Sequence, residues 1–167
     1  YLGIEDKRMR VGFGYDIHQL KAGRPCILGG VQIESELGPD GHSDADVLIH
    51  ALMDAMLGAA GLRDIGYYFP PEDDQYKGIS SMLLLEKVNF LLKERGLQAY
   101  NIDIMVISET PKLKPHIDTM KANLQSVLEI PLDRISIKAT TNEMLGAIGR
   151  REGIAAQAVV SVYEGEV

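Results

Sequence analysis

The order of two kinds of apolar pattern along the chain constrains its fold more than any other feature of the sequence. Strands are predicted at about 9–14, 26–34, 100–109, 134–140 and 154–163, and helices, with apolar residues three to four apart, at about 44–60, 80–95 and 116–128. The helices are therefore grouped between strands. This order predicts an α+β fold, an α/β two-layer sandwich in which a mixed β-sheet carries the helices on one face, plus a small hairpin.

The connecting segments refine this arrangement. Residues 21–25 have the composition of a turn, so the first two strands are expected to form the hairpin. Ser43 and Asp46 have the spacing of a capping box, which predicts the start of the first helix. The segment 61–78 is a loop long enough to suggest a lid or a binding role.

The size of the chain predicts one domain. A chain of 167 residues that is 46% hydrophobic can fill one core, and residues 9–167 are expected to form it. Residues 1–8 show no periodic pattern and are expected to be disordered or an artificial remnant. Cys26 is the only cysteine, so no intramolecular disulfide can form, and a buried position is expected.

Charge and hydropathy narrow the classes of partner. No segment resembles a signal peptide or approaches the ~20 apolar residues that span a bilayer, which predicts a cytoplasmic protein without a membrane partner. The net charge of −7 argues against a nucleic-acid partner. An anionic small molecule remains compatible with it, because a metal ion, a helix N-terminus, Lys112, Lys114 and Arg150 can make a local positive pocket.

Three residues have the types and spacing of a metal site. Asp16 and His18 are two residues apart, so at the end of a strand both side chains point to the same side. With His50 from the first predicted helix they offer three ligands and leave a fourth tetrahedral position open, as in catalytic zinc sites. Surface residues explain the spacing equally well. Asp46 and Asp54 lie one helical turn from His50 and either orient its imidazole or are only solvated.

Two further segments fit an anionic ligand. His42 and Ser43 precede the first helix, where they either belong to an acidic helix cap or bind a phosphate at the helix N-terminus. Thr140, Thr141 and Glu143 lie at the end of a predicted strand and either cap a helical turn there or contact phosphate oxygens and a magnesium ion.

Seven segments occur in an order that is typical of one family. They are Gly14-Tyr15-Asp16-Ile17-His18, Gly41-His42-Ser43-Asp44-Ala45-Asp46-Val47, Asp64-Ile65-Gly66, Phe69-Pro70, Pro111-Lys112, Lys138-Ala139-Thr140-Thr141 and Gly149-Arg150. Over about residues 10–163 the chain resembles the 2-C-methyl-D-erythritol 2,4-cyclodiphosphate synthases, which act in the non-mevalonate pathway of isoprene (terpenoid) biosynthesis.

The resemblance implies a phosphorus–oxygen lyase. The 2-phosphate of 4-diphosphocytidyl-2-C-methyl-D-erythritol 2-phosphate would attack the β-phosphorus of the diphosphate, which gives the 2,4-cyclodiphosphate and releases cytidine monophosphate (CMP). It also implies Zn²⁺ or another divalent cation on Asp16, His18 and His50, and Mg²⁺ or Mn²⁺ on the diphosphate near Glu143. The catalytic domain would form a homotrimer with active sites between subunits.

The resemblance also assigns roles to single residues. His42 and Thr141 would stabilise the transition state, and Ser43 would help to hold the attacking phosphate. Residues 110–114 would hold cytosine, largely through backbone groups. The implied substrate contacts are Asp16, His18, His42, Ser43, Asp64, Ile65, Gly66, Phe69, Pro70, Asp73, Thr110, Pro111, Lys112, Leu113, Lys114, Thr140, Thr141, Asn142, Glu143 and Arg150.

Two positions depart from the family pattern, and two other functions stay open. Pro71 stands where many relatives carry aspartate, and Ala147 where some carry an aromatic residue. The residues also fit a metal-dependent phosphodiesterase or nucleotide hydrolase, with Asp46 or Glu143 as the base beside an activated water. A binding module with structural zinc is disfavoured, because structural zinc sites are usually closed. A bacterial cytoplasm is favoured over a plastid stroma.

Overall fold

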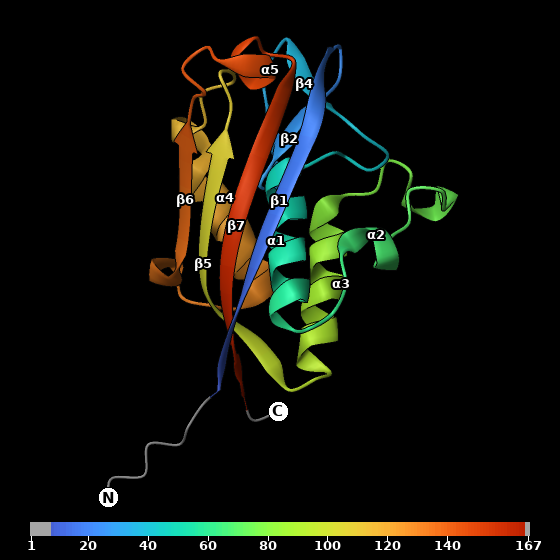
Figure 1. The fold of residues 1–167 in the computed structure, drawn as a ribbon, viewed down its shortest axis with the longest axis vertical. Helices are drawn as coiled ribbons and strands as arrows, with labels where there is room; N and C mark the ends of the chain where they lie inside the picture. The colour runs from blue at the N-terminus through green and yellow to red at the C-terminus, as the bar shows by residue number, and fades with distance from the viewer. Residues whose placement is uncertain (1–7, 166–167) are drawn as a thin grey trace, which may run out of the picture.

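The computed structural model describes residues 8–165, which form two sheets (Figure 1). The larger sheet has five strands in the order β4-β1-β7-β5-β6, and β2 pairs with β3 in a separate sheet. The β5–β6 pair is parallel and the other pairs of the larger sheet are antiparallel, which confirms the predicted mixed sheet. The strands are β1 Met9–Ala22, β2 Cys26–Leu28, β3 Val31–Ile33, β4 Leu37–Asp40, β5 Leu97–Ile107, β6 Ile135–Thr140 and β7 Gly153–Glu164.

The helices gather on one face of the larger sheet, as predicted, and the opposite face is turned toward the viewer in Figure 1. Helix α1 lies against β1 and β7, and α3 packs on its other side, so α1 is buried almost all round. The helices are α1 Val47–Ala59, α2 Ile65–Tyr68, α3 Ser81–Lys93, α4 Ile117–Leu128 and α5 Gly146–Gly149, with short 3₁₀ turns at Asp74–Tyr76, Lys114–His116 and Leu132–Arg134.

Two glycines of β1 allow α1 to approach the strand at backbone distance. A Cβ atom at Gly12 would lie 1.9 Å from the carbonyl oxygen of Ala55, and one at Gly14 would lie 1.9 Å from that of Ala51. No side chain fits in this space, so glycine is needed at both positions. The alanines opposite keep the helix surface equally flat.

The predicted pairing of the first two strands is wrong. β1 continues to Ala22, well past the predicted end at residue 14, and pairs with β7 and β4. The predicted strand 26–34 folds back on itself as β2 and β3, because Gly29 and Gly30 between them adopt φ values of 57° and 71°. Two successive residues with positive φ make a tight turn. The small hairpin therefore exists, but it lies within residues 26–33.

Helix α1 begins three residues later than predicted, and the capping-box interpretation is wrong. Asp46 is the N-cap, and its carboxylate accepts a hydrogen bond from the backbone N–H of Ile49 at 3.1 Å. It also accepts from the N–H groups of Gly29 and Gly30, at 3.0 and 2.8 Å. The carboxylate is fully buried, which raises its pKa to about 6. The side chain of Asp46 therefore both caps α1 and holds the β2–β3 turn. Ser43 does not cap the helix, and its Oγ contacts Nε2 of His50 instead.

Other predictions differ mainly in short elements. The loop 61–78 contains α2 and the 3₁₀ turn at 74–76, and α5 lies in the segment 141–153. These elements were not predicted, because one-turn helices leave no apolar period in the sequence.

The predicted burial of single residues is confirmed. Ile102, Ile104 and Val106 are buried together, as predicted. Cys26 is buried as well, and burial raises the pKa of its thiol to about 11. Of residues 1–8, only Arg8 lies within the described residues.

Candidate functional site

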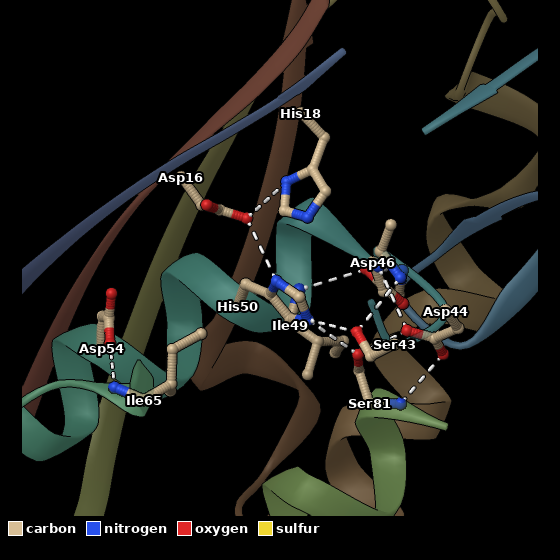
Figure 2. Close-up of polar contacts among 12 residues, drawn as sticks. Asp16, His18, Ser43, Asp44, Asp46, Ile49, His50, Asp54, Ile65 and Ser81 are labelled. Atoms are coloured by element: carbon tan, nitrogen blue, oxygen red, sulfur yellow. Dashed lines mark hydrogen bonds and ion pairs between the residues drawn. The ribbon is translucent and has the colours of Figure 1, made fainter. Parts of the chain in front are cut away.

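The three predicted metal ligands come together between β1 and α1. Oδ2 of Asp16 lies 3.0 Å from Nδ1 of His18 and 3.2 Å from Nδ1 of His50 (Figure 2). One ligand atom from each residue falls within 4.8 Å of those from the other two. The structure therefore confirms that these side chains are neighbours, although two come from a strand and the third from a helix 32 residues further on.

The glycines of β1 explain this meeting. Asp16 and His18 follow Gly14 at intervals of two, so all three face α1. Since α1 contacts the strand at backbone distance, His50 reaches the two β1 ligands directly. Gly41 serves the other side of the site, because a Cβ atom there would lie 2.9 Å from Nε2 of His18.

The charges in this cluster fit a shared cation. Burial raises the pKa of Asp16, but the two histidines outweigh that effect and hold it below its usual range. Burial lowers the pKa of His50, whereas Asp16 raises it, and the net direction is upward. Oδ2 of Asp16 and Nδ1 of His18 are buried without a hydrogen bond, although they are only 3.0 Å apart. Buried polar atoms without a hydrogen bond are unfavourable, and a cation bound by both atoms would satisfy them.

The second nitrogen of His50 contacts two serines. Nε2 lies 3.0 Å from Oγ of Ser81 and 3.2 Å from Oγ of Ser43 (Figure 2). The expectation that Asp46 or Asp54 orients this ring is wrong, and the alternative of a solvated carboxylate fails for Asp46, which is fully buried. Asp46 binds backbone N–H groups, and Oδ1 of Asp54 accepts from a backbone N–H at the start of α2. A serine at the start of α3 gave no signal in the sequence beyond that of a helix cap.

A pocket of about 230 Å³ opens beside the cluster. Its lining includes the site residues His18, His42, Ser43, His50, Ile65, Gly66 and Phe69, together with Pro71, Tyr76 and Leu84, which sequence analysis did not assign to the substrate. Nε2 of His42 is hydrogen-bonded to the carbonyl oxygen of Asp73 at 3.1 Å. The segment 61–78 therefore forms one wall of the pocket, which agrees with its predicted binding role.

The remaining contacts predicted in this segment have structural partners. Asp64 is the N-cap of α2, and its Oδ1 accepts from the N–H of Tyr67 at 3.2 Å. Pro70 follows Phe69 directly, and the carboxylate of Asp73 begins the next 3₁₀ turn. These residues shape the wall of the pocket without lining it.

The second half of the predicted substrate set does not line this pocket. It comprises Thr110, Pro111, Lys112, Leu113, Lys114, Thr140, Thr141, Asn142, Glu143 and Arg150. Oε1 of Glu109 accepts from the N–H groups of Asn142 and Met144 and so holds the exposed turn after β6. Leu113 is buried in the core, and Arg150 forms an exposed ion pair with a neighbouring glutamate. Lys112, Lys114 and Arg150 therefore do not form the expected positive pocket around the candidate metal ligands.

Within residues 8–165, none of the helices has the length and apolar composition needed to cross a membrane.

Known proteins with similar sequences and structures identify the family. The family model of the YgbB family matches residues 9–163. A 2-C-methyl-D-erythritol 2,4-cyclodiphosphate synthase from Synechococcus elongatus is 60% identical over 152 residues, which cover 91% of this chain and 95% of that protein. Another from Cytophaga hutchinsonii is 55% identical, over 91% of this chain and 96% of the relative.

Solved structures agree with the sequence matches. A structure described as IspF of Plasmodium falciparum in complex with CDP is 32% identical, with a TM-score of 0.84, over 96% of this chain and 99% of that one. The bifunctional IspDF of Campylobacter jejuni is 42% identical with a TM-score of 0.92; the match covers 96% of this chain but 43% of that larger protein. The chain therefore belongs to the YgbB family, the family of its 2-C-methyl-D-erythritol 2,4-cyclodiphosphate synthase relatives.

Proposed function

We propose that this chain, a cyclodiphosphate synthase and phosphorus–oxygen lyase by family, converts 4-diphosphocytidyl-2-C-methyl-D-erythritol 2-phosphate to the 2,4-cyclodiphosphate with release of CMP. An oxygen of the 2-phosphate forms a bond to the β-phosphorus while the bond from that phosphorus to the oxygen bridging to the α-phosphate breaks. The observation that carries the proposal is the Asp16, His18 and His50 cluster facing a pocket lined by His42 and Ser43.

Asp16, His18 and His50 are proposed to hold one divalent cation, and we favour Zn²⁺ because of the mixed carboxylate and imidazole ligands. An ion there supplies Lewis-acid stabilisation to a diphosphate oxygen, a contribution of several kcal/mol. The chain's own residues must then place the two phosphates in line. Since the nucleophile is already an anion, alignment and charge neutralisation are what the reaction needs.

His42 and Ser43 are proposed to contact the phosphates inside the pocket. Nε2 of His42 is held by the carbonyl of Asp73, so this ring has a fixed position on the pocket wall. Ser43 lines the pocket beside His50, and its Oγ accepts from the N–H of Ala45 at 3.2 Å. Both side chains are therefore held by hydrogen bonds at the wall of the pocket in which we propose that the anion binds.

The second half of the substrate set is proposed to act from a neighbouring subunit. Thr141 would stabilise the transition state, Glu143 would bind Mg²⁺ or Mn²⁺, and residues 110–114 with Arg150 would hold the cytidine end. Residues 110–114 follow β5, Thr141 and Glu143 follow β6, and Arg150 is the C-cap of α5. The relative from Plasmodium falciparum was solved with CDP, which agrees with a cytidine phosphate as ligand.

We propose the homotrimer that the family resemblance implies, and an exposed apolar face of β1 supports contact between copies. β1 turns one apolar side chain in two away from the helices, and these are exposed in the single chain: Met9, Val11, Phe13, Tyr15 and Ile17. A stripe of this kind on a sheet face usually marks an interface. We propose that this stripe packs against the same face of other copies. Residues 9–167 are proposed to form one catalytic domain, and the protein is proposed to act in a bacterial cytoplasm.

His50→Ala tests the metal site. The variant is expected to stay folded but to lose bound zinc, and turnover should fall about 10³-fold, since several kcal/mol of transition-state stabilisation is lost. Metal content is measured by elemental analysis, and folding by circular dichroism. Full turnover in a zinc-free variant would disprove the assignment.

The reaction itself is tested by mass spectrometry. The purified protein is incubated with the diphosphocytidyl substrate and magnesium in ¹⁸O-labelled water, with and without a chelator. CMP and the cyclic diphosphate without ¹⁸O, both lost on chelation, are the expected products. A linear product that carries ¹⁸O would support the phosphodiesterase or nucleotide hydrolase, an alternative that the family match does not favour.

A further inference from the structure

The imidazole of His50 faces two different environments. Its Nδ1 points toward Asp16, 3.2 Å from Oδ2, and its Nε2 points toward Oγ of Ser81, 3.0 Å away. Figure 2 shows the ring between these groups, with Ser81 linked in turn to Asp44. A neutral imidazole carries one proton, so the neighbours decide which nitrogen is left to bind a cation.

The hydrogen bonds of Ser81 determine where that proton lies. Its hydroxyl is in short contact with Oδ1 of Asp44, and an ionised carboxylate can only accept. The single hydroxyl proton therefore goes to Asp44, and Oγ of Ser81 is left as an acceptor for His50. Asp44 is itself held in place, because its carboxylate accepts from the backbone N–H of Ser81 at 2.9 Å and of Asp46 at 3.2 Å.

We propose that Asp44 and Ser81 are positioning residues that keep the proton of His50 on Nε2 and leave the lone pair of Nδ1 for the cation. This inference rests on the proposed metal site and deepens it. Partners of this kind orient metal-bound histidines in many proteins. Ser81 is fully buried, so a solvent molecule cannot simply replace its hydroxyl.

The arrangement has a consequence for Ser43. When Nε2 of His50 carries the proton, the Oγ atoms of Ser81 and Ser43 share it, at 3.0 and 3.2 Å, and Oγ of Ser43 also accepts from the N–H of Ala45. The hydroxyl proton of Ser43 is then free to be donated into the pocket that Ser43 lines. The same chain of hydrogen bonds thus prepares both a cation ligand and a donor for an anionic substrate.

Zinc affinity is the first test, with zinc alone as the probe. Ser81→Ala is expected to weaken zinc binding about 10- to 100-fold in competition with a chelating dye. Ser80→Ala is the matched control, because Ser80 caps the same helix through the N–H of Met82 but does not contact His50. It should leave the zinc affinity within about twofold of the wild type. Equal affinities for Ser81→Ala and the wild type would overturn the proposal.

A spectroscopic test separates positioning from a general loss of structure. In the zinc-loaded, ¹⁵N-labelled wild type, the Nε2–H of His50 should give a slowly exchanging proton resonance. Ser81→Ala should lose this resonance, and Ser81→Thr, which keeps the hydroxyl, should recover both it and the zinc affinity. A zinc-loaded wild type with its proton on Nδ1 of His50 would refute the inference, whatever the variants do.

Asp44→Asn tests whether the two residues act as one chain. The amide cannot replace both carboxylate oxygens, so this substitution should weaken zinc binding in the wild type but add little in the Ser81→Ala background. Additive losses would show separate roles and contradict the proposal. A wild type that binds no zinc would instead remove the proposed metal site itself, which is a different outcome from zinc binding that ignores Ser81.

Discussion

The two groups of predicted site residues differ in how the chain holds them. Asp16, His18 and His50 lie between β1 and α1, where glycines bring the two backbones together and buried hydrogen bonds hold the ring of His50. Thr141 and Glu143 lie in an exposed turn after β6, braced mainly by the carboxylate of Glu109. A single chain brings the three candidate metal ligands together by itself, whereas few other residues pack over the exposed turn.

The composition of the exposed turn strengthens the contrast. Met144 and Leu145 are 80% and 69% exposed, and Glu143 and Met144 both adopt positive φ values, of 51° and 62°. Large apolar side chains next to a strained, polar turn are unusual on a free surface. This difference agrees with the proposal that the second region acts together with another copy of the chain.

Phe13→Asp is expected to have the largest effect, because it places a charge in the exposed stripe of β1. If neighbouring copies pack there, the variant should dissociate and lose turnover by about 10³-fold, the effect of several kcal/mol. Phe90→Asp is the matched control, since Phe13 and Phe90 are both 61% exposed but Phe90 lies on α3. Analytical ultracentrifugation measures the assembly. Equal behaviour of the two variants would contradict a shared site.

How much of this could be predicted from the sequence follows from the range of each interaction. The spacing of Asp16 and His18 is local, and a strand turns both to one side whatever surrounds it. His50 was proposed as the third ligand from its place on the first predicted helix, and the family resemblance implied the same role. The partners of His50 could not be predicted, because Ser81 lies 31 positions away and meets the ring only through the packing of α3 on α1.

The fold was predictable to a similar degree. Apolar periods indicated the long helices and the strands of the mixed sheet, but not the partners of β1. The alternation of Phe13, Tyr15 and Ile17 continues past Gly14, so the sequence carried a signal for a longer β1 that the predicted end at residue 14 did not use. The pairing of β1 with β7 and β4 could not be predicted, because those strands lie far away in the sequence.

Gly14→Val tests the first region from inside. The added side chain would meet the backbone of α1, and overpacking should lower the free energy of unfolding by about 3 kcal/mol and weaken zinc binding. Gly58→Ala is its control, because that glycine of α1 has open space around it. This change should raise stability by up to about 1 kcal/mol. Urea unfolding measures both, and equal stabilities would mean that α1 does not depend on the glycine.

Thr141→Ala tests the second region. If Thr141 contacts the transition state, kcat should fall about 100-fold while KM changes little, and the hydroxyl in Thr141→Ser should restore most of the rate. The steady-state rates of all three proteins are compared. An unchanged kcat with a raised KM would make Thr141 a binding residue only. The alanine should also loosen the turn slightly, because Oγ1 of Thr141 accepts from the N–H of Glu143.

The smallest expected effect concerns Asp46, which begins α1 and holds the β2–β3 turn. Its pKa is raised by burial from 3.8 to about 6, so the folded protein binds this proton more tightly than the unfolded chain. The stability that the proton contributes is fully present below about pH 4 and is lost as the pH rises through about 6. The negative charge of Asp44 acts in the same direction, and the Cys26 thiol stays neutral.

Asp46→Asn replaces the ionisable carboxyl group with an amide. The variant should therefore lose the part of the pH dependence of the free energy of unfolding that comes from Asp46. Between about pH 4 and 6, the metal-free wild type should lose on the order of 1 kcal/mol relative to the variant. The slopes are compared, because an amide cannot accept all three backbone hydrogen bonds and the variant starts from a lower stability. The turn at residues 141–145 buries no such carboxylate, so this pH dependence belongs to the packed region. Parallel slopes for the two proteins would mean that the ionisation of Asp46 does not change the free energy of unfolding.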